Sequence, residues 1–222
     1  MNIRLYMLFC SLGLTSACVG IQASIPVELA SKTTALRVTM ASDAKAGRVF
    51  KFGGYESYGL KETPLQTVSQ GGLIAKDLEF RFEMIGENAD GWKIECKSSE
   101  TVKPGIESNP TEMLSRELSC KLIGPQSDIW RLRFSASRQG SDFGSGELRA
   151  TRKRLSVHGL SAVGDKEKIA GYGIALLSRP VAAVQSVGQT QGWLVSDLSG
   201  RMRSAISASM TALIVFDDIS NR

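Results

Sequence analysis

The sequence predicts a mainly β domain: about ten to twelve short antiparallel strands, arranged as a barrel or a sandwich and followed by a buried apolar helix. Three observations lead to this expectation. Apolar and charged residues alternate through residues 78–85, short β-rich segments recur between glycine-containing turns, and residues 204–216 are free of charge with helical spacing of their bulky side chains.

The clearest strand is LEFRFEMI, in which Leu78, Phe80 and Phe82 alternate with charged residues. The turn NADG joins it to GWKIEC and predicts a β-hairpin. We expect residues 98–113 to form a loop before the strands RELSCKLI and IWRLRFSA. Further strands are expected at ALRVTM, RVFKF, ELRATR, LSVHGL, AGYGIALL, PVAAVQSV and GWLV, with weaker ones near Tyr58 and Gln66.

The predicted C-terminal helix covers about residues 198–216, and a helix with so little polar surface is normally enclosed. Its flanking charges oppose the helix dipole, because Arg201 and Arg203 lie at its positive end and Asp217 and Asp218 at its negative end. Burial must therefore stabilise this helix. We expect the two aspartates to diverge toward solvent.

The segment PVAAVQSV, then GWLVSDL, then the apolar helix resembles the Tubby C-terminal-like superfamily, which includes phospholipid scramblases and LURP-one-related proteins. The resemblance implies a closed antiparallel barrel of about twelve strands with the helix threaded through it. The alternative is a β-sandwich with a C-terminal helix packed beside it.

The N-terminus has the pattern of a secretory signal peptide over residues 1–17. Arg4 is the only charged residue before Glu28, and an apolar run follows it. Cys18 at the end of LTSAC then has three interpretations. It is the lipid-attachment site of a lipoprotein precursor, a residue near an ordinary signal-peptidase cut after Ala17 or Ala23, or a buried thiol in an uncleaved helix.

LTSAC resembles the lipobox of bacterial lipoproteins, with threonine where an aliphatic residue is commonest. The resemblance implies acyl chains such as palmitate on Cys18, which would hold the protein at a lipid bilayer. Residues 18–34 would be a tether and residues 35–222 a single β-rich domain. Val19 stands where aspartate would retain a lipoprotein in the inner membrane, so the resemblance favours the outer membrane, facing the periplasm.

Two of the four cysteines are expected to form a disulfide. Cys10 leaves with the signal peptide and Cys18 is the lipid-attachment site, which leaves Cys96 and Cys120. Each shares the apolar face of its strand with neighbouring bulky residues, and an even pair in an exported chain favours a disulfide.

Few residues point to catalysis. The chain has a single histidine, His158, and no GxSxG, HExxH or Walker-type motif. We therefore predict no catalytic residues, no metal ligands and no cofactor. A periplasmic hydrolase using His158 remains the alternative from another functional class, and a carrier of an apolar ligand inside an empty barrel is a third.

The strongest binding signal is a dense run of cations in a chain with a formal net charge of +5. Its members are Arg149, Arg152, Lys153 and Arg154, with Arg131 and Arg133 on a preceding strand. Such a patch favours anionic headgroups, although a solvated hairpin would have the same composition. Export argues against nucleic acid as the ligand. The sequence thus predicts a binding or structural role at an anionic lipid surface, with another envelope protein as the alternative partner.

Overall fold

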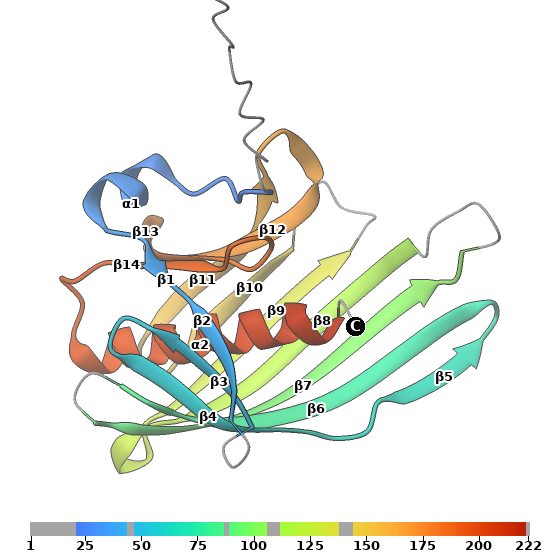
Figure 1. Cartoon of the computed structure of the whole chain (residues 1–222), viewed down its shortest axis with the longest axis horizontal. Coiled ribbons are helices and arrows are strands. Elements are labelled where there is room, and N and C mark those ends of the chain that lie inside the picture. The colour runs from blue at the N-terminus through green and yellow to red at the C-terminus, as the bar shows by residue number, and fades with distance from the viewer. Residues whose placement is uncertain (1–20, 44–46, 87–88, 106–111, 138–143, 221–222) are drawn as a thin grey trace, which may run out of the picture.

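The strands form one antiparallel sheet of 14 strands, which curls into a nearly closed barrel around a C-terminal helix, α2 (Gly200–Ser220) (Figure 1). This computed structural model describes residues 21–43, 47–86, 89–105, 112–137 and 144–220. It confirms the mainly β fold and the barrel, and it excludes the sandwich.

The remaining elements follow one another around the barrel, and neighbours in sequence are mostly neighbours in the sheet. The two other helical segments are α1 (Val27–Lys32) and the 3-10 turn η1 (Pro125–Ser127). The strands are β1 (Leu36–Arg37), β2 (Thr39–Asp43), β3 (Gly47–Phe52), β4 (Tyr55–Glu62), β5 (Gln66–Gln70), β6 (Leu73–Ile85), β7 (Gly91–Lys103), β8 (Glu112–Ile123), β9 (Ile129–Ser137), β10 (Ser145–Arg149), β11 (Arg154–Ala162), β12 (Asp165–Leu176), β13 (Arg179–Gln185) and β14 (Gln191–Leu194).

One short stretch of chain connects the two edges of the sheet. β1 pairs with β14, whereas β2, which begins two residues after β1 ends, pairs with β3. Between them the N–H of buried Val38 donates a hydrogen bond to the carbonyl of Thr190 at 3.0 Å. Because this stretch satisfies backbone groups on both edges, little of the barrel seam is left open.

The sheet encloses its core through simple alternation along each strand. In β6, Phe80, Phe82 and Met84 are at most 3% exposed, while the charged residues between them face solvent. α2 fills the space inside and contacts β4, β7, β8, β12 and β13. Small residues allow this close approach: Ala205 and Ala208 are fully buried. The expected buried apolar helix is thus confirmed.

The loop between β7 and β8 and the helix α2 differ in length from expectation. The expected loop over residues 98–113 is strand at both of its ends, because β7 runs to Lys103 and β8 begins at Glu112. Residues 98–101 are partly buried and all but Val102 in this stretch are polar, so the alternation that marks a strand is lost there. α2 extends to Ser220, four residues past its expected end.

The described part of the expected tether is docked on the barrel. α1 packs on β13 and β14 with Leu29 only 1% exposed, and Ala23 forms a β-bridge with Ala162. Cys18 and the expected signal peptide lie outside the described residues. Among the described residues, no helix is long and apolar enough to cross a membrane.

Candidate anion-binding face

Four cations occupy directly opposed positions on four neighbouring strands. Lys121 of β8 is paired in register with Arg131 of β9, Arg131 with Arg149 of β10, and Arg149 with Arg154 of β11. At the usual strand spacing the four side chains fall within about 15 Å. We call Lys121, Arg131, Arg149 and Arg154 the cation row.

Alternation explains why the cation row faces outward. Each member is exposed on the outer face of its strand, and Arg131, for example, lies between Trp130 and Leu132, which are 2% and 0% exposed. The side chains of Arg149 and Arg154 are 66% and 77% exposed. The turn between β10 and β11 adds the exposed Arg152 and Lys153 at the same end of these strands.

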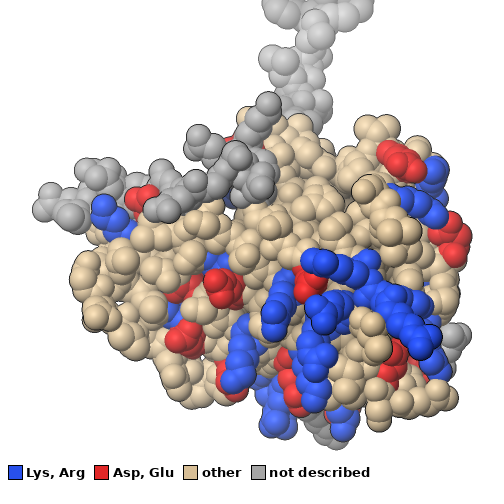
Figure 2. All heavy atoms as spheres, turned by 180° about the vertical axis from the view of Figure 1, so that it is seen from behind, with Lys and Arg blue, Asp and Glu red and all other residues tan. Residues whose placement is uncertain are grey.

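The cations of the row outnumber the carboxylates near it. Glu147 lies 2.7 Å from Arg154 and 3.9 Å from Arg149, and so partly neutralises one end. Within the described ranges, no ion pair joins Lys121 or Arg131 to a carboxylate. Figure 2 shows lysine and arginine gathered over the lower part of this face. Like charges directly opposed across strands are destabilising, so the row has an energetic cost in the free protein.

A hollow of about 740 Å³ adjoins the cation row on the outer face. Its charged lining consists of the cations Lys61, Arg81, Lys97, Lys121, Arg131 and Arg133 and the carboxylates Glu62, Glu79 and Glu95. Lys97 binds Glu79 at 2.6 Å, and this hydrogen bond raises the pKa of Lys97. The hollow is thus net basic and open to solvent, as a site for anionic groups requires.

A second hollow, of about 850 Å³, lies on the same face and has the opposite balance. Its charged lining consists of the carboxylates Asp77, Glu79, Glu117 and Glu147 and the cations Lys97 and Arg133. These residues belong to the two rows of the sheet next to the cation row, because Arg133 pairs with Glu147 and Glu117 pairs with Ser135. The net charge of the outer face therefore changes along the strands, from positive around the cation row to negative in the second hollow.

The structure places the sequence-predicted cations together. Arg149 and Arg154 lie in the row, Arg152 and Lys153 in the turn beside it, and Arg131 in the row as well. Sequence reasoning missed Lys121, which sits alone among apolar neighbours. Only the pairing of β8 with β9 brings it beside Arg131.

Within the described residues, His158 belongs to no catalytic group. It lies opposite Ser145 on one side and Gly173 on the other. Its ring fills the space over Gly173, where a Cβ would come within 2.4 Å of Nε2. Burial lowers the pKa of His158. Among the described residues, His158 has neither a hydrogen bond to Ser145 nor a carboxylate that would orient its ring.

A second polar cluster closes around the end of α2. Asp217, 4% exposed, accepts hydrogen bonds from Tyr172 at 2.6 Å and from Arg116 at 2.7 Å, and a further one from Ser186. The guanidinium of Arg116 also lies 4.1 Å from the ring centroid of Phe216. Burial and the neighbouring Asp217 raise the pKa of Tyr172 well above its ordinary value.

This cluster corrects the expectation that the paired aspartates point into solvent. Asp217 is buried against cationic and hydroxyl groups of the barrel wall, and Asp218 pairs with Arg48 of β3. The cations opposite them offset the unfavourable helix dipole, which local sequence reasoning could not foresee. Asp217, Arg116 and Tyr172 are buried, so we assign this cluster to structure and not to ligand binding.

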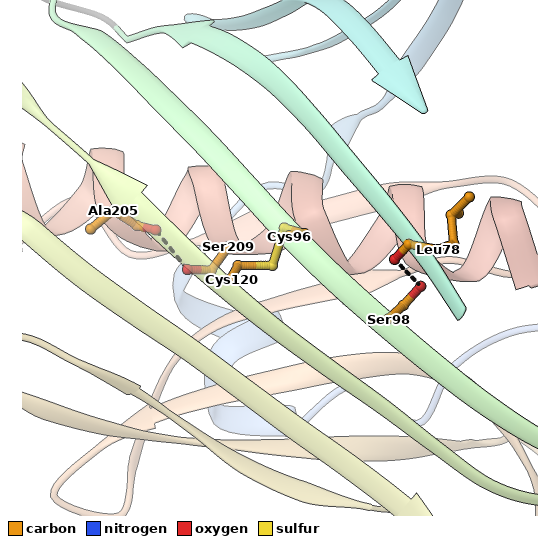
Figure 3. Close-up of a disulfide and its surroundings, with 6 residues drawn as sticks. All are labelled: Leu78, Cys96, Ser98, Cys120, Ala205 and Ser209. Atoms are coloured by element: carbon orange, nitrogen blue, oxygen red, sulfur yellow. Dashed lines mark hydrogen bonds between the residues drawn. A yellow bond between two sulfur atoms is a disulfide. The ribbon is translucent and has the colours of Figure 1, made fainter. Parts of the chain in front are cut away.

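The predicted disulfide partners occupy opposed positions in β7 and β8, with 4.1 Å between their Cα atoms, and a disulfide joins Cys96 to Cys120. Figure 3 shows the disulfide near α2, where Ser209 donates a hydrogen bond to the carbonyl of Ala205 at 2.8 Å. Both cysteines are 3% exposed. The disulfide therefore joins two strands that contact the central helix.

In the described part of the chain, no group of three His, Cys, Asp or Glu residues is placed to hold a metal ion.

The chain matches no family model, no curated protein and no solved structure. The cation row and its surroundings are therefore the features that bear on function.

Proposed function

We propose that this chain is a lipid-anchored protein of the bacterial envelope that binds anionic headgroups through its cation row and performs no catalysis. The observation that carries the proposal is the register of Lys121, Arg131, Arg149 and Arg154. Sheets usually avoid like charges in opposed positions, so a row of four is best explained by a ligand that compensates for their repulsion.

The expected strength of binding follows from the number of cations. Each Lys or Arg close to an anionic bilayer contributes about 1 kcal/mol of attraction, so four cations with Arg152 and Lys153 beside them suffice for a weak but useful contact. Salt would screen this attraction, because exposed charges interact over a Debye length of about 8 Å at physiological ionic strength.

The lipid anchor supplies the local concentration that such a contact needs. We propose Cys18 as the attachment point, in the outer membrane and facing the periplasm. Mass spectrometry of the membrane fraction should find an acylated N-terminal cysteine, and Cys18→Ala should release the protein. A free N-terminus at Ser24 would contradict this part of the proposal.

Vesicle sedimentation tests the binding surface directly. The chain from Val19 onward should sediment with phosphatidylglycerol vesicles and not with phosphatidylcholine vesicles. Replacing Arg131, Arg149 and Arg154 by glutamine should weaken this binding about a hundredfold. The matched control replaces three exposed cations outside the row, Arg37, Lys51 and Lys168, by glutamine and should retain it. If both variants lose binding equally, the binding depends on net charge and not on the cation row.

We also propose membership of the Tubby C-terminal-like superfamily. Support comes from the antiparallel barrel and from α2, which contacts strands on several sides of it. The headgroup-binding residues of that superfamily cannot be matched to positions here, so the proposed cation row stands independently of this relationship. An apolar-ligand carrier is less favoured because α2 occupies the barrel interior.

A further inference from the structure

The N-terminal segment is fixed to one end of the barrel. The N–H of Val163 donates to the carbonyl of Gln22 at 2.7 Å, and the N–H of Ser24 donates to the carbonyl of Ser161 at 2.8 Å. Between them, the N–H of Ala23 donates to the side chain of Gln185 at 3.0 Å. Gln22 is thus held at the turn between β11 and β12, which we call the anchor end.

Covalent geometry limits how far Cys18 can be from the anchor end. Cys18 lies four positions before Gln22, and four residue steps of chain span at most about 14 Å. A lipid on Cys18 would therefore hold the turn between β11 and β12 close to the bilayer. This end also exposes apolar side chains, since Val163 is 65% and Ile21 41% exposed.

The cation row lies at the opposite end of the same strand. β11 begins at Arg154, a member of the row, and ends at Ala162, which bridges Ala23. Arg154 and Ala162 are eight residue steps apart along the strand, or about 26 Å. The figures agree with this arrangement, because the described chain enters near the top of Figure 1, whereas most of the lysine and arginine visible in Figure 2, turned about the vertical axis, lies in the lower half.

The face between the two ends does not suit an anionic bilayer. It contains the second hollow, of about 850 Å³, lined by four carboxylates and two cations. If the barrel lay flat on the anchoring membrane, the exposed Asp77 and Glu117 would face the headgroups together with the row, and the hollow would remain unfilled. Repulsion from these carboxylates favours an upright barrel, with the anchor end at the membrane and the row away from it.

We infer that the cation row binds the anionic headgroups of a second bilayer, opposite the one that holds the anchor, so that the protein bridges two lipid surfaces. This inference rests on the proposed function for the lipid anchor and the row. The row is exposed, extends across four strands and lies next to a turn with two more cations, which suits a broad array of phosphates. The change from positive to negative charge along β8–β11 then determines how the barrel is oriented between the two bilayers.

A bridging assay tests this orientation. The chain from Cys18 onward offers one free thiol, because Cys96 and Cys120 are joined, and this thiol can be coupled to maleimide-lipid in phosphatidylcholine vesicles. These vesicles should cluster with a second population that contains phosphatidylglycerol, as measured by energy transfer between dyes in the two populations. The Arg131, Arg149 and Arg154 to glutamine variant should weaken clustering about a hundredfold, and the Arg37, Lys51 and Lys168 control should not.

The outcomes separate the inference from the proposed function. If the uncoupled chain binds phosphatidylglycerol vesicles but the coupled chain does not cluster them, the bridging orientation is wrong and the binding surface stands. The same holds if phosphatidylglycerol placed in the anchoring vesicles suppresses clustering, because the row would then reach its own membrane. If the uncoupled chain binds neither lipid, both proposals fail.

Discussion

Arg131 and Arg149 occupy directly opposed positions on the outer faces of β9 and β10, with Lys121 and Arg154 extending the row on either side. Like charges in this arrangement cost stability in the free protein. Binding sites commonly reduce the stability of a protein in this way. Replacing one of the opposed cations is a simple way to detect the loss.

Arg149→Gln should therefore stabilise the barrel. We expect the free energy of unfolding to rise by about 0.2–1 kcal/mol at low salt, with the gain shrinking as salt screens the row. Urea denaturation at two ionic strengths measures the effect. Lys32→Gln is the control, because Lys32 is paired with Glu28 at 2.8 Å and its loss relieves no repulsion. A destabilised Arg149→Gln protein would contradict the repulsion argument.

Ala208→Asp should unfold the domain or lower its melting temperature sharply. Ala208 is fully buried in α2, and an unpaired charge at that position should cost about 3–5 kcal/mol, a large part of the stability of an ordinary domain. Thermal melting followed by circular dichroism is the measurement. Val68→Asp places the same charge at a residue that is 58% exposed and should leave the midpoint nearly unchanged. Equal midpoints for the two variants would exclude an enclosed helix.

Asp217→Asn should destabilise the barrel through the loss of a charge partner. The substitution keeps an acceptor for Tyr172 but leaves Arg116, 8% exposed, without its 2.7 Å ion pair, at a cost of about 3–5 kcal/mol. Adding Arg116→Met should recover much of this loss, because neither buried charge then remains. A double-mutant cycle in urea measures the coupling. Additive losses would show that the two residues act independently.

His158 should make the barrel less stable in acid. Because burial lowers its pKa below 6.5 in the folded chain, the unfolded chain takes up the proton first as the pH falls. The unfolded state then binds more protons, so the free energy of unfolding declines below about pH 6.5 and is unaffected by this group above it. The free energy of unfolding of the His158→Gln variant should decline less than that of the parent chain between pH 7.5 and pH 5, as measured by urea denaturation of both proteins. If the free energy of unfolding declines equally in both proteins, the pKa of His158 does not change on folding.

Loss of the disulfide should weaken the barrel without changing its shape. Cys96 and Cys120 are 24 residues apart, and closing a loop of that size contributes about 3 kcal/mol in the chain-entropy model. Replacing both cysteines by alanine should lower the free energy of unfolding by about this amount, measured in urea. A reducing agent should destabilise the parent chain and leave the double variant unaffected.

The sequence predicts most strands and the enclosed helix because one-sided burial leaves a readable pattern. Phe80 and Phe82 alternate with charged residues, and Cys96 and Cys120 each share an apolar face, so the strands and the disulfide follow from local order. The extension of β7 over residues 98–101 leaves no such pattern, because its residues are partly buried on both faces.

The candidate site was only partly predictable because it depends on register. Arg149 and Arg154 flank one turn, so they are recognisable together, but Lys121 joins the row only through the pairing of β8 with β9. The burial of Asp217 depends likewise on Arg116, which lies 101 residues earlier in the chain. Single-sequence patterns do not determine such long-range pairings.

The most direct test of the cation row is the partition constant of the chain from Val19 onward on phosphatidylglycerol vesicles, measured from low to high salt. The parent chain should bind with a constant that falls steeply with salt, because exposed cations supply the attraction. The Arg131, Arg149 and Arg154 to glutamine variant should bind about a hundredfold more weakly at low salt and lose most of the salt dependence. Binding of that variant equal to the parent, with the same salt dependence, would contradict the account.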